Sequence, residues 1–208
     1  FGKEVFIGLG GDPGSVGDSK PFVMTSTDGQ AWSDITPIAG RNMLRRVCYG
    51  NDRFVAVGDR GRRAASKDGK EWTDTPNVKA IDSLIDVTFG NERFVGVGLH
   101  GLRMSSEDGV TWSERLVGEE GEHINSVRWT GERFVAVGQG ATYISPDGRK
   151  WERLPNANAP LIAVYGEQRF VGSNWRGRLL HSKDAVTWQD IFQAEQHVEA
   201  LAFGTIEK

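Results

Sequence analysis

A segment of about 40 residues recurs along this chain of 208 residues. Each copy contains the pattern Ser-x-Asp-Gly-x-x-Trp, with Ala185 replacing the glycine in the last copy. The copies span residues 26–32, 66–72, 106–112, 145–151 and 182–188. A period of this length is typical of repeat architectures such as propellers and solenoids, so one structural unit is expected to explain the whole chain.

A second pattern runs in phase with the first. It reads YGNDRFVAVG from Tyr49, FGNERFVGVG from Phe89, WTGERFVAVG from Trp129, YGEQRFVGS from Tyr165 and FGKEVFIGLG from Phe1. Runs of Val, Phe, Ile and Tyr separated by Gly, Asn and Asp are typical of short strands joined by turns. In the second copy, we expect strands at 44–49, 53–58 and 63–66 and a fourth beginning at Trp72. Four strands in about 40 residues are typical of a propeller blade.

The sequence therefore predicts an all-β protein, a five-bladed β-propeller of four-stranded antiparallel blades forming one domain over residues 1–208. The N-terminus supplies only three strands, and HVEALAFG at 197–204 matches an inner strand without partners. We expect these ends to pair and close the ring, which removes exposed sheet edges. The predicted blades are 197–204 with 1–36, 43–76, 83–116, 123–155 and 160–192.

Composition excludes several classes of protein. The 25 Lys and Arg residues nearly balance 28 Asp and Glu residues, which argues against binding nucleic acid through its phosphates. No apolar run approaches the roughly 18 residues of a membrane span, and the N-terminal segment lacks signal-peptide features. The compartment stays open, secreted or periplasmic if a signal peptide was removed. Cys48 is the single cysteine, so no internal disulfide forms, and a monomer is expected.

The Asp-containing turn is interpreted as structural. Its Ser and Asp oxygens accept hydrogen bonds from nearby backbone N–H groups, its Gly permits a positive φ, and its Trp packs between sheets. Calcium is the alternative, but one carboxylate per turn supplies too few oxygens. Ala185 predicts that the last turn is the least regular. The four histidines, His100, His123, His181 and His197, lack metal-ligand spacing, so no metal or cofactor is expected.

The turn motif resembles the Asp-box, or BNR, repeat, S-x-D-x-G-x-x-W, with one residue fewer. The resemblance implies a sialidase-like propeller with these turns opposite the ligand face. The family includes sialidases, other glycosidases, sugar-binding proteins, receptor domains and assembly factors, so fold does not decide function. A sialidase is not expected, since the family's enzyme needs a tyrosine nucleophile. Tyr49 and Tyr165 belong to the aromatic row, and Tyr143 leads into a turn.

Candidate site residues are polar positions where the copies differ. The first strand of each blade lines the channel, and its Val47 and Tyr49 rows are core. Polar side chains precede these rows and predict an opposed-charge ring, which binds a ligand or plugs the channel with salt bridges. Other candidates lie on loops of the same face. The ligand-binding candidates are Arg45, Arg46, Asp86, Asn125, Glu199, His100, Trp175 and Arg176.

The leading functional hypothesis is a non-enzymatic propeller that binds a glycan or a protein segment over this face. A glycoside hydrolase using Asp86 and Glu199 is the alternative, but neighbouring arginines would lower both pKa values, which is wrong for a general acid. A structural module without a ligand is the second alternative. Cys48 is expected to be buried and unreactive. A Gly-rich insertion at 10–22 predicts a flexible loop over the face, as a lid or as simple length variation.

Overall fold

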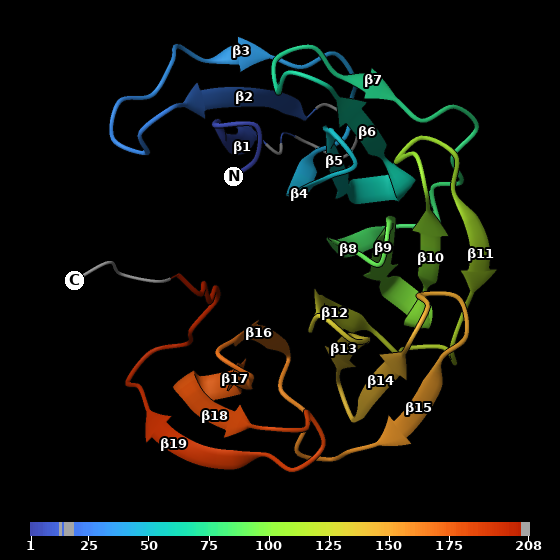
Figure 1. The fold of residues 1–208 in the computed structure, drawn as a ribbon, viewed down its shortest axis with the longest axis vertical. Helices are drawn as coiled ribbons and strands as arrows, with labels where there is room; N and C mark the ends of the chain where they lie inside the picture. Colours follow the sequence, from blue (N-terminus) through green and yellow to red (C-terminus); the bar gives the residue numbers. More distant parts are fainter. Residues whose placement is uncertain (13, 15–18, 205–208) are drawn as a thin grey trace.

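The computed structural model describes residues 1–12, 14 and 19–204. Figure 1 shows five small sheets that follow one another around an arc. Each sheet is an antiparallel meander, with strands in chain order from the concave side outward. The predicted all-β architecture of five propeller blades is confirmed.

Blades 1 to 5 are named in chain order. Blade 1 contains β1 (Phe6–Asp12), β2 (Lys20–Ser26) and β3 (Thr36–Pro37). Blade 2 contains β4 (Leu44–Gly50), β5 (Arg53–Gly58), β6 (Arg63–Ser66) and β7 (Thr73–Asp74). Blade 3 contains β8 (Leu84–Gly90), β9 (Arg93–Gly98), β10 (Arg103–Ser106) and β11 (Ser113–Leu116). Blade 4 contains β12 (Ile124–Trp129), β13 (Phe134–Gly138), β14 (Ala141–Ser145) and β15 (Glu152–Pro155). Blade 5 contains β16 (Ile162–Gly166), β17 (Arg169–Asn174), β18 (Arg178–Ser182) and β19 (Gln189–Gln193).

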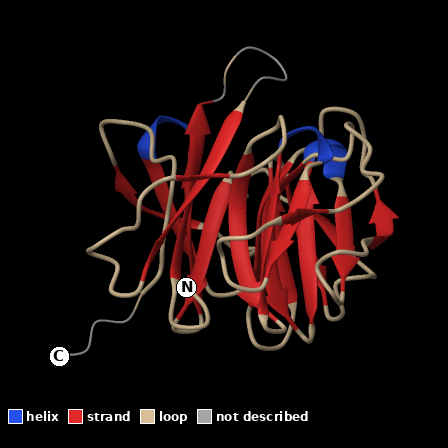
Figure 2. Cartoon of the chain, turned by 90° about the horizontal axis from the view of Figure 1, so that it is seen from above, coloured by secondary structure: helices blue, strands red, loops and turns tan. Residues whose placement is uncertain are grey.

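Short 3₁₀ turns mark one end of the blades. They are η1 (Asp59–Gly61), η2 (Leu99–Gly101) and η3 (Trp175–Gly177), between the second and third strands of blades 2, 3 and 5. Figure 2 shows these turns at one end of the strands and the N-terminus at the other. We call the end with η1, η2 and η3 the 3₁₀ face; the Asp-containing turns lie at the opposite end. None of the described elements is a helix long and apolar enough to cross a membrane.

The core lies between neighbouring blades. Both faces of a middle blade are covered, so the second strands read as continuous apolar runs rather than alternating ones. Their phenylalanines are buried and pack on the aromatic residue of the inner strand, with ring centroids 4.9 Å apart for Tyr49 and Phe54. The same row contacts the preceding blade at glycine, since a Cβ on Gly50 would lie 2.0 Å from Phe89. This close approach explains the recurring aromatic–Gly pair.

The Asp-containing turns form the predicted hydrogen bonds. In the second copy, Ser66 Oγ accepts the Gly69 N–H at 2.8 Å, and Asp68 Oδ1 accepts the Lys70 and Glu71 N–H groups. The same bonds recur in the other four copies. The structural interpretation of the turn is therefore confirmed.

The expectation that the last turn is the least regular is wrong. Ala185 adopts the positive φ of 64° that glycine has elsewhere, and the Trp188 indole N–H donates to its carbonyl at 2.9 Å. The first turn is the less complete one, because Trp32 is 43% exposed and makes no such bond among the described residues. Trp188 is buried between blades 4 and 5, and this packing stabilises the turn.

Replacing Gly148 with Ala tests how tightly these turns pack against the preceding blade. Gly148 has φ +71°, and an added Cβ would lie 2.5 Å from Val95. We expect a loss of about 3 kcal/mol in the free energy of unfolding, from left-handed strain and overpacking together. Gly121→Ala is the matched control, because Gly121 has φ +81° with nothing within 4 Å, and about 1 kcal/mol is expected there. Equal losses in urea titrations would contradict the packing contribution.

The predicted ring closure is wrong for the described chain. Blade 1 has three strands, and residues 197–204 form no strand. The reason is that the aromatic–Gly pair occurs at both ends of the chain. Phe1 packs on Phe6 at 4.4 Å, and Gly2 pairs with Val5, so this pair already fills the end of the inner-strand position in blade 1. Phe203 instead packs over Gly166 of blade 5, 2.2 Å from an added Cβ.

The insertion differs in part from its prediction. Residues 10–12 and 20–22 belong to β1 and β2, paired as Gly10 with Phe22 and Asp12 with Lys20, rather than to a loop. The tip of the insertion, residues 13 and 15–18, lies outside the described residues. Gly14 and Ser19 are described and reach the 3₁₀ face.

Candidate functional site

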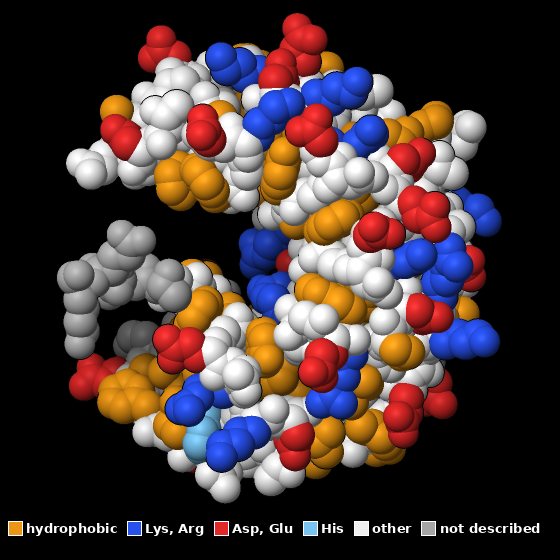
Figure 3. Space-filling model, in the orientation of Figure 1, with side chains coloured by type: hydrophobic (Ala, Val, Ile, Leu, Met, Phe, Trp, Pro, Cys, Tyr) orange, Lys and Arg blue, Asp and Glu red, His pale blue; other side chains and the backbone are white. Residues whose placement is uncertain are grey.

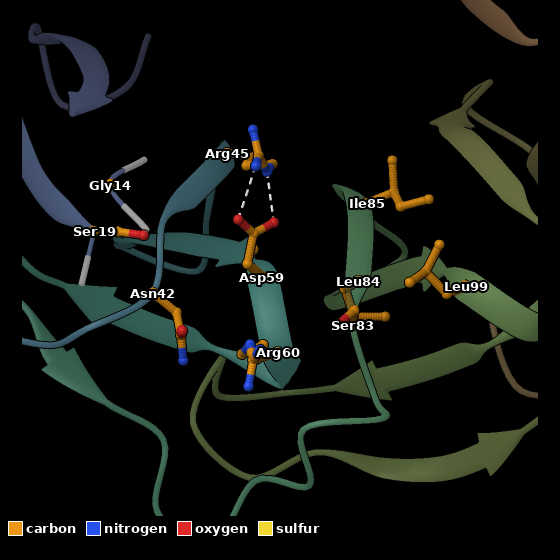
Figure 4. Close-up of a pocket in the computed structure, with 11 residues that line it drawn as sticks. Gly14, Ser19, Asn42, Arg45, Asp59, Arg60, Ser83, Leu84, Ile85 and Leu99 are labelled. Carbon is orange, nitrogen blue, oxygen red and sulfur yellow. Dashed lines mark hydrogen bonds and ion pairs between the residues drawn. The ribbon is translucent and has the colours of Figure 1, made fainter. Parts of the chain in front are cut away.

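A cavity of about 480 Å³ opens on the 3₁₀ face between blades 2 and 3. The polar side of the cavity is formed by β4, by the connection before it and by η1. The opposite side is formed by β8, by the turn before it and by η2. Figure 4 shows the lining side chains on both sides of the opening. They are Asn42, Arg45, Asp59 and Arg60 from blade 2, and Ser83, Leu84, Ile85 and Leu99 from blade 3, with Gly14 and Ser19 at the border.

Arg45 and Asp59 form a two-point ion pair in this cavity. Arg45 Nε and Nη2 donate to Asp59 Oδ1 and Oδ2 at 2.5 and 2.8 Å. The pair joins the start of β4 to the turn that follows β5, two segments brought together by the β4–β5 ladder. The hydrogen bond to Asp59 raises the pKa of Arg45, so the guanidinium stays charged. Both side chains remain partly exposed and face the cavity.

The cavity combines this charged pair with an apolar wall. Leu84 is buried, and Ile85 and Leu99 are partly buried beside it. Arg60 has φ 51° in η1 and lines the cavity from the blade 2 side. A site with an apolar wall and one charged, bidentate group fits a segment that carries both an apolar and a polar side chain.

Asp86 is a structural carboxylate in this fold. It is only 4% exposed, and its Oδ2 accepts the Val127 N–H at 2.9 Å and the Arg128 Nη1 donor at 2.5 Å. Asp86 Oδ1 accepts the N–H of Val87. These bonds join the inner strands of blades 3 and 4. The partner of Asp86 is therefore Arg128 and not the Arg45 and Arg46 pair.

The predicted opposed-charge ring does not form among the described residues. Arg46 is exposed, and its Nη1 donates to the Arg45 carbonyl at 3.1 Å. Glu199 is exposed on the segment beside blade 5, and neither residue has an ion pair in the described chain. Asn125 is half-buried on β12. Figure 3 shows basic side chains in the hollow of the arc, where the inner strands carry Arg45, Arg46 and Arg128.

The other three candidates lie on the 3₁₀ face but outside the cavity. The His100 N–H contacts His123 Nδ1 at 3.3 Å, and the two rings meet edge to face. Trp175 is 64% exposed and stacks on His197 with centroids 4.9 Å apart. Arg176 has φ 61°, and its carbonyl accepts a hydrogen bond from Gln193. Of the eight predicted residues, only Arg45 lines the cavity.

Sequence reasoning missed Asp59 and Arg128. Asp59 directly follows the strand expected at 53–58, in the loop that leads to the next strand. Arg128 lies between the two rows that were interpreted as core. Opposite charges at these positions were visible in the sequence, but their pairing depends on how one strand meets the next.

The single cysteine, Cys48, lies on β4 and contacts the core of blade 3. Burial raises the pKa of the Cys48 thiol, which favours its protonated form at neutral pH. The side chain is half-buried against blade 3 rather than fully enclosed. Residues 1–12, 14 and 19–204 contain no cluster of three or more His, Cys, Asp or Glu side chains that could hold a metal ion.

Comparison with known proteins identifies the fold. No model of a protein family matches the chain, and no curated protein matches it. Solved structures do match. YCF48 bound to a D1 peptide is 21% identical, with 82% of this chain and 60% of that one covered and a TM-score of 0.57.

Two enzymes also have this fold. A streptogramin B lyase is 11% identical, with 89% and 72% covered and a TM-score of 0.66. An ancestral GH74 enzyme is 15% identical, with 91% and 32% covered and a TM-score of 0.63. The chain thus spans less than two thirds of the YCF48 and GH74 chains. At these identities the likeness concerns architecture, and this chain has the β-propeller fold.

Proposed function

We propose that this protein is a non-enzymatic binding propeller that holds an extended protein segment at the cavity between blades 2 and 3. The observation that carries the proposal is the Arg45–Asp59 pair beside the apolar wall of Leu84, Ile85 and Leu99. A paired guanidinium keeps its side chain in one place and offers its remaining N–H groups to a backbone or side-chain oxygen. The structure of YCF48 with a D1 peptide gives a precedent for peptide binding on this architecture.

Glycoside hydrolysis by a pair of carboxyl groups has little support at this face. A hydrolase needs two carboxyl groups that face a sugar, one of them protonated. Asp86 is committed to Arg128 and two backbone N–H groups, and Asp59 is committed to Arg45. A glycan remains the second ligand class, with Trp175 as the exposed stacking surface.

We also assign the repeat to the Asp-box type. The support is the shared hydrogen-bonding pattern of the five turns and their common place, between the last two strands of each blade. The shorter spacing of aspartate and glycine distinguishes these turns from the usual motif. The assignment concerns the turn and implies no sialidase chemistry.

Replacing Arg45 with Ala tests the binding proposal. Peptides are selected from a phage-displayed random dodecapeptide library, and the tightest is titrated by calorimetry. We expect Arg45→Ala to weaken it at least about tenfold, because the truncation removes a charged anchor. Arg178→Ala is the matched control, since Arg178 forms a similar two-point pair with Asp190 at blade 5, and its effect should stay within about twofold.

Two outcomes would contradict the proposal. Equal affinities for both variants would remove the cavity from the binding site. Turnover of aryl glycosides that is lost in Asp86→Asn would instead favour a hydrolase.

A further inference from the structure

We propose that a second cavity, bordered by Arg63 of β6 and by Asp82 in the turn before β8, receives a phenol ring, as the tyrosine side chain of a partner protein or as a small free phenol. This cavity of about 290 Å³ lies between blades 2 and 3, among their outer strands. It shares no lining residue with the cavity at Arg45, so the site goes beyond the proposed function and is independent of it.

The junction between blades 3 and 4 shows the arrangement with a tyrosine in place. Tyr143 of β14 is fully buried, and its ring centroid lies 5.2 Å from Cζ of Arg103 and 6.0 Å from Cζ of Arg153. Its hydroxyl donates to the Glu122 carboxylate, which also accepts the Nε–H of Arg153. Burial and the bond to Glu122 raise the pKa of Tyr143 to about 12, so the hydroxyl remains a donor. Two guanidinium groups and one carboxylate thus hold one phenol ring.

The same three charged groups recur one repeat earlier, at the junction between blades 2 and 3. Arg63 and Asp82 lie 40 residues before Arg103 and Glu122, at the same places in the repeat. The third group is on the last strand of its blade, where Arg115 Nε donates to Asp82 Oδ1 at 2.9 Å. The charged surroundings of a buried phenol are therefore present twice in this fold.

The two junctions differ in the residue at the centre. Met104 of β10 precedes its Asp-containing turn by the same two positions as Tyr143 does in β14. Methionine has neither a ring nor a hydroxyl. Arg63 and Asp82 consequently border a cavity, which Met104 lines from one side.

Several polar atoms around this cavity have no partner among the described residues. Asp82 is buried, and both contacts with Arg115 reach its Oδ1, which leaves Oδ2 without a donor. Arg63 is buried too; its Nη2 donates to the Asp82 carbonyl at 3.0 Å, but its Nε has no acceptor. The buried Thr75 hydroxyl also lacks a partner. A phenol hydroxyl both donates and accepts, so it can serve a carboxylate and a donor of this lining.

The rest of the lining suits an aromatic ring. Met104 and Trp112 supply apolar surface, and Arg63 Cζ lies 5.5 Å from the Trp112 ring centroid. A bound ring beside Arg63 adds a second cation–π contact to this guanidinium. A cavity of roughly 150 Å³ is sufficient for benzene, so a phenol has room here. The cavity is open to solvent, because its lining includes the exposed residues Asn77, Lys79 and Thr111.

The charges of the lining favour a neutral occupant. Arg63 and Lys79 attract an anion, but the Asp82 carboxylate repels it, and a cation meets the opposite balance. A neutral phenol offers its ring face to the guanidinium and its hydroxyl to the carboxylate, and adds no charge of its own.

Methyl-labelled methionine tests the site in the unmodified protein. Of the three methionines, Met24, Met43 and Met104, the last lines this cavity. In NMR titrations, p-cresol should move the Met104 methyl resonance and leave the other two in place. The same shift with N-acetyl-tyrosine amide would identify a partner's tyrosine as the source, and a shift with p-cresol alone would identify a free phenol. 4-Methylanisole lacks the donor and should bind at least about tenfold more weakly.

Met104→Tyr tests the site from the protein side, because its own ring should occupy the cavity as Tyr143 does in the next blade. Binding of p-cresol, measured by saturation-transfer NMR, should be lost in this variant. Met104→Leu is the matched control: it conserves volume, leaves the cavity open and should keep the affinity within about twofold.

Three outcomes would overturn the proposal, whether or not Met104→Tyr folds. The first is p-cresol leaving the Met104 resonance of the unmodified protein in place. The second is equal affinity for p-cresol and 4-methylanisole, since the hydroxyl would then have no role. The third is tighter binding of 4-methylbenzoate than of p-cresol, which would make the cavity an anion site.

Discussion

Replacing Asp86 with Ala is expected to lower the free energy of unfolding by about 3 kcal/mol. The carboxylate is 4% exposed, and its loss leaves the Arg128 guanidinium without its ion partner and the Val127 N–H without an acceptor. Removing one partner of a buried pair costs roughly 3–5 kcal/mol, and the lower end applies because the Arg128 side chain keeps 30% exposure. Urea titration of both proteins measures the difference.

Two comparisons isolate the reason for this loss. Asp59→Ala breaks the partly exposed pair with Arg45 and should cost no more than about 1 kcal/mol. Asp86→Ala combined with Arg128→Met should cost less than the sum of the single changes, because the two side chains act together. If Asp86→Ala instead kept full stability and abolished peptide binding, Asp86 would be a ligand residue and its structural assignment would be wrong.

Acid is expected to unfold the protein below pH 4, with Tm falling at least about 10 °C between pH 5 and pH 2.5. The cause is the set of aspartates in the five Asp-containing turns. N–H bonds from Gln30 and Ala31 lower the pKa of Asp28, and those from Glu71 and Lys70 lower the pKa of Asp68. At Asp184, partial burial opposes the shift, but N–H bonds from Thr187 and Val186 lower the pKa to about 2. The pKa values of Asp108 and Asp147 are lowered in the same way.

The direction of this effect follows from proton linkage. An aspartate in the unfolded chain has a pKa of about 3.9, so below that pH the unfolded state binds more protons than the folded one. The stabilisation is complete above pH 4 and is lost as pH falls through the folded pKa values. Scanning calorimetry of Asp184→Ala supplies the control. Its deficit relative to the unmodified protein should shrink towards pH 2, because protonation weakens the same hydrogen bonds, and a constant deficit would contradict the mechanism.

Local repetition made most of the architecture predictable. Each RFVAVG run, Asp-containing turn and aromatic–Gly pair specifies a strand or a turn from nearby residues alone, and five copies confirm one another. The blade core follows from the same rows. The site was less predictable. Comparing the five copies shows which positions vary and so are not required by the repeat, but it does not show which residues of other blades these positions contact. Asp86 was chosen for its difference from the other copies, yet it serves the contact between blades 3 and 4.

The sequence by itself determined the strands, the turn chemistry and the number of sheets, since these depend on hydrogen bonds and side chains within one repeat. Only the tertiary structure decided what happens between repeats. It paired Asp59 with Arg45 and Asp86 with Arg128, and it gave the aromatic position of blade 1 to Phe1 rather than Phe203. The physical reason is that both ends of the chain carry the same aromatic–Gly pair, Phe1–Gly2 and Phe203–Gly204. Their local preferences are identical, so packing decides which pair occupies the position in blade 1.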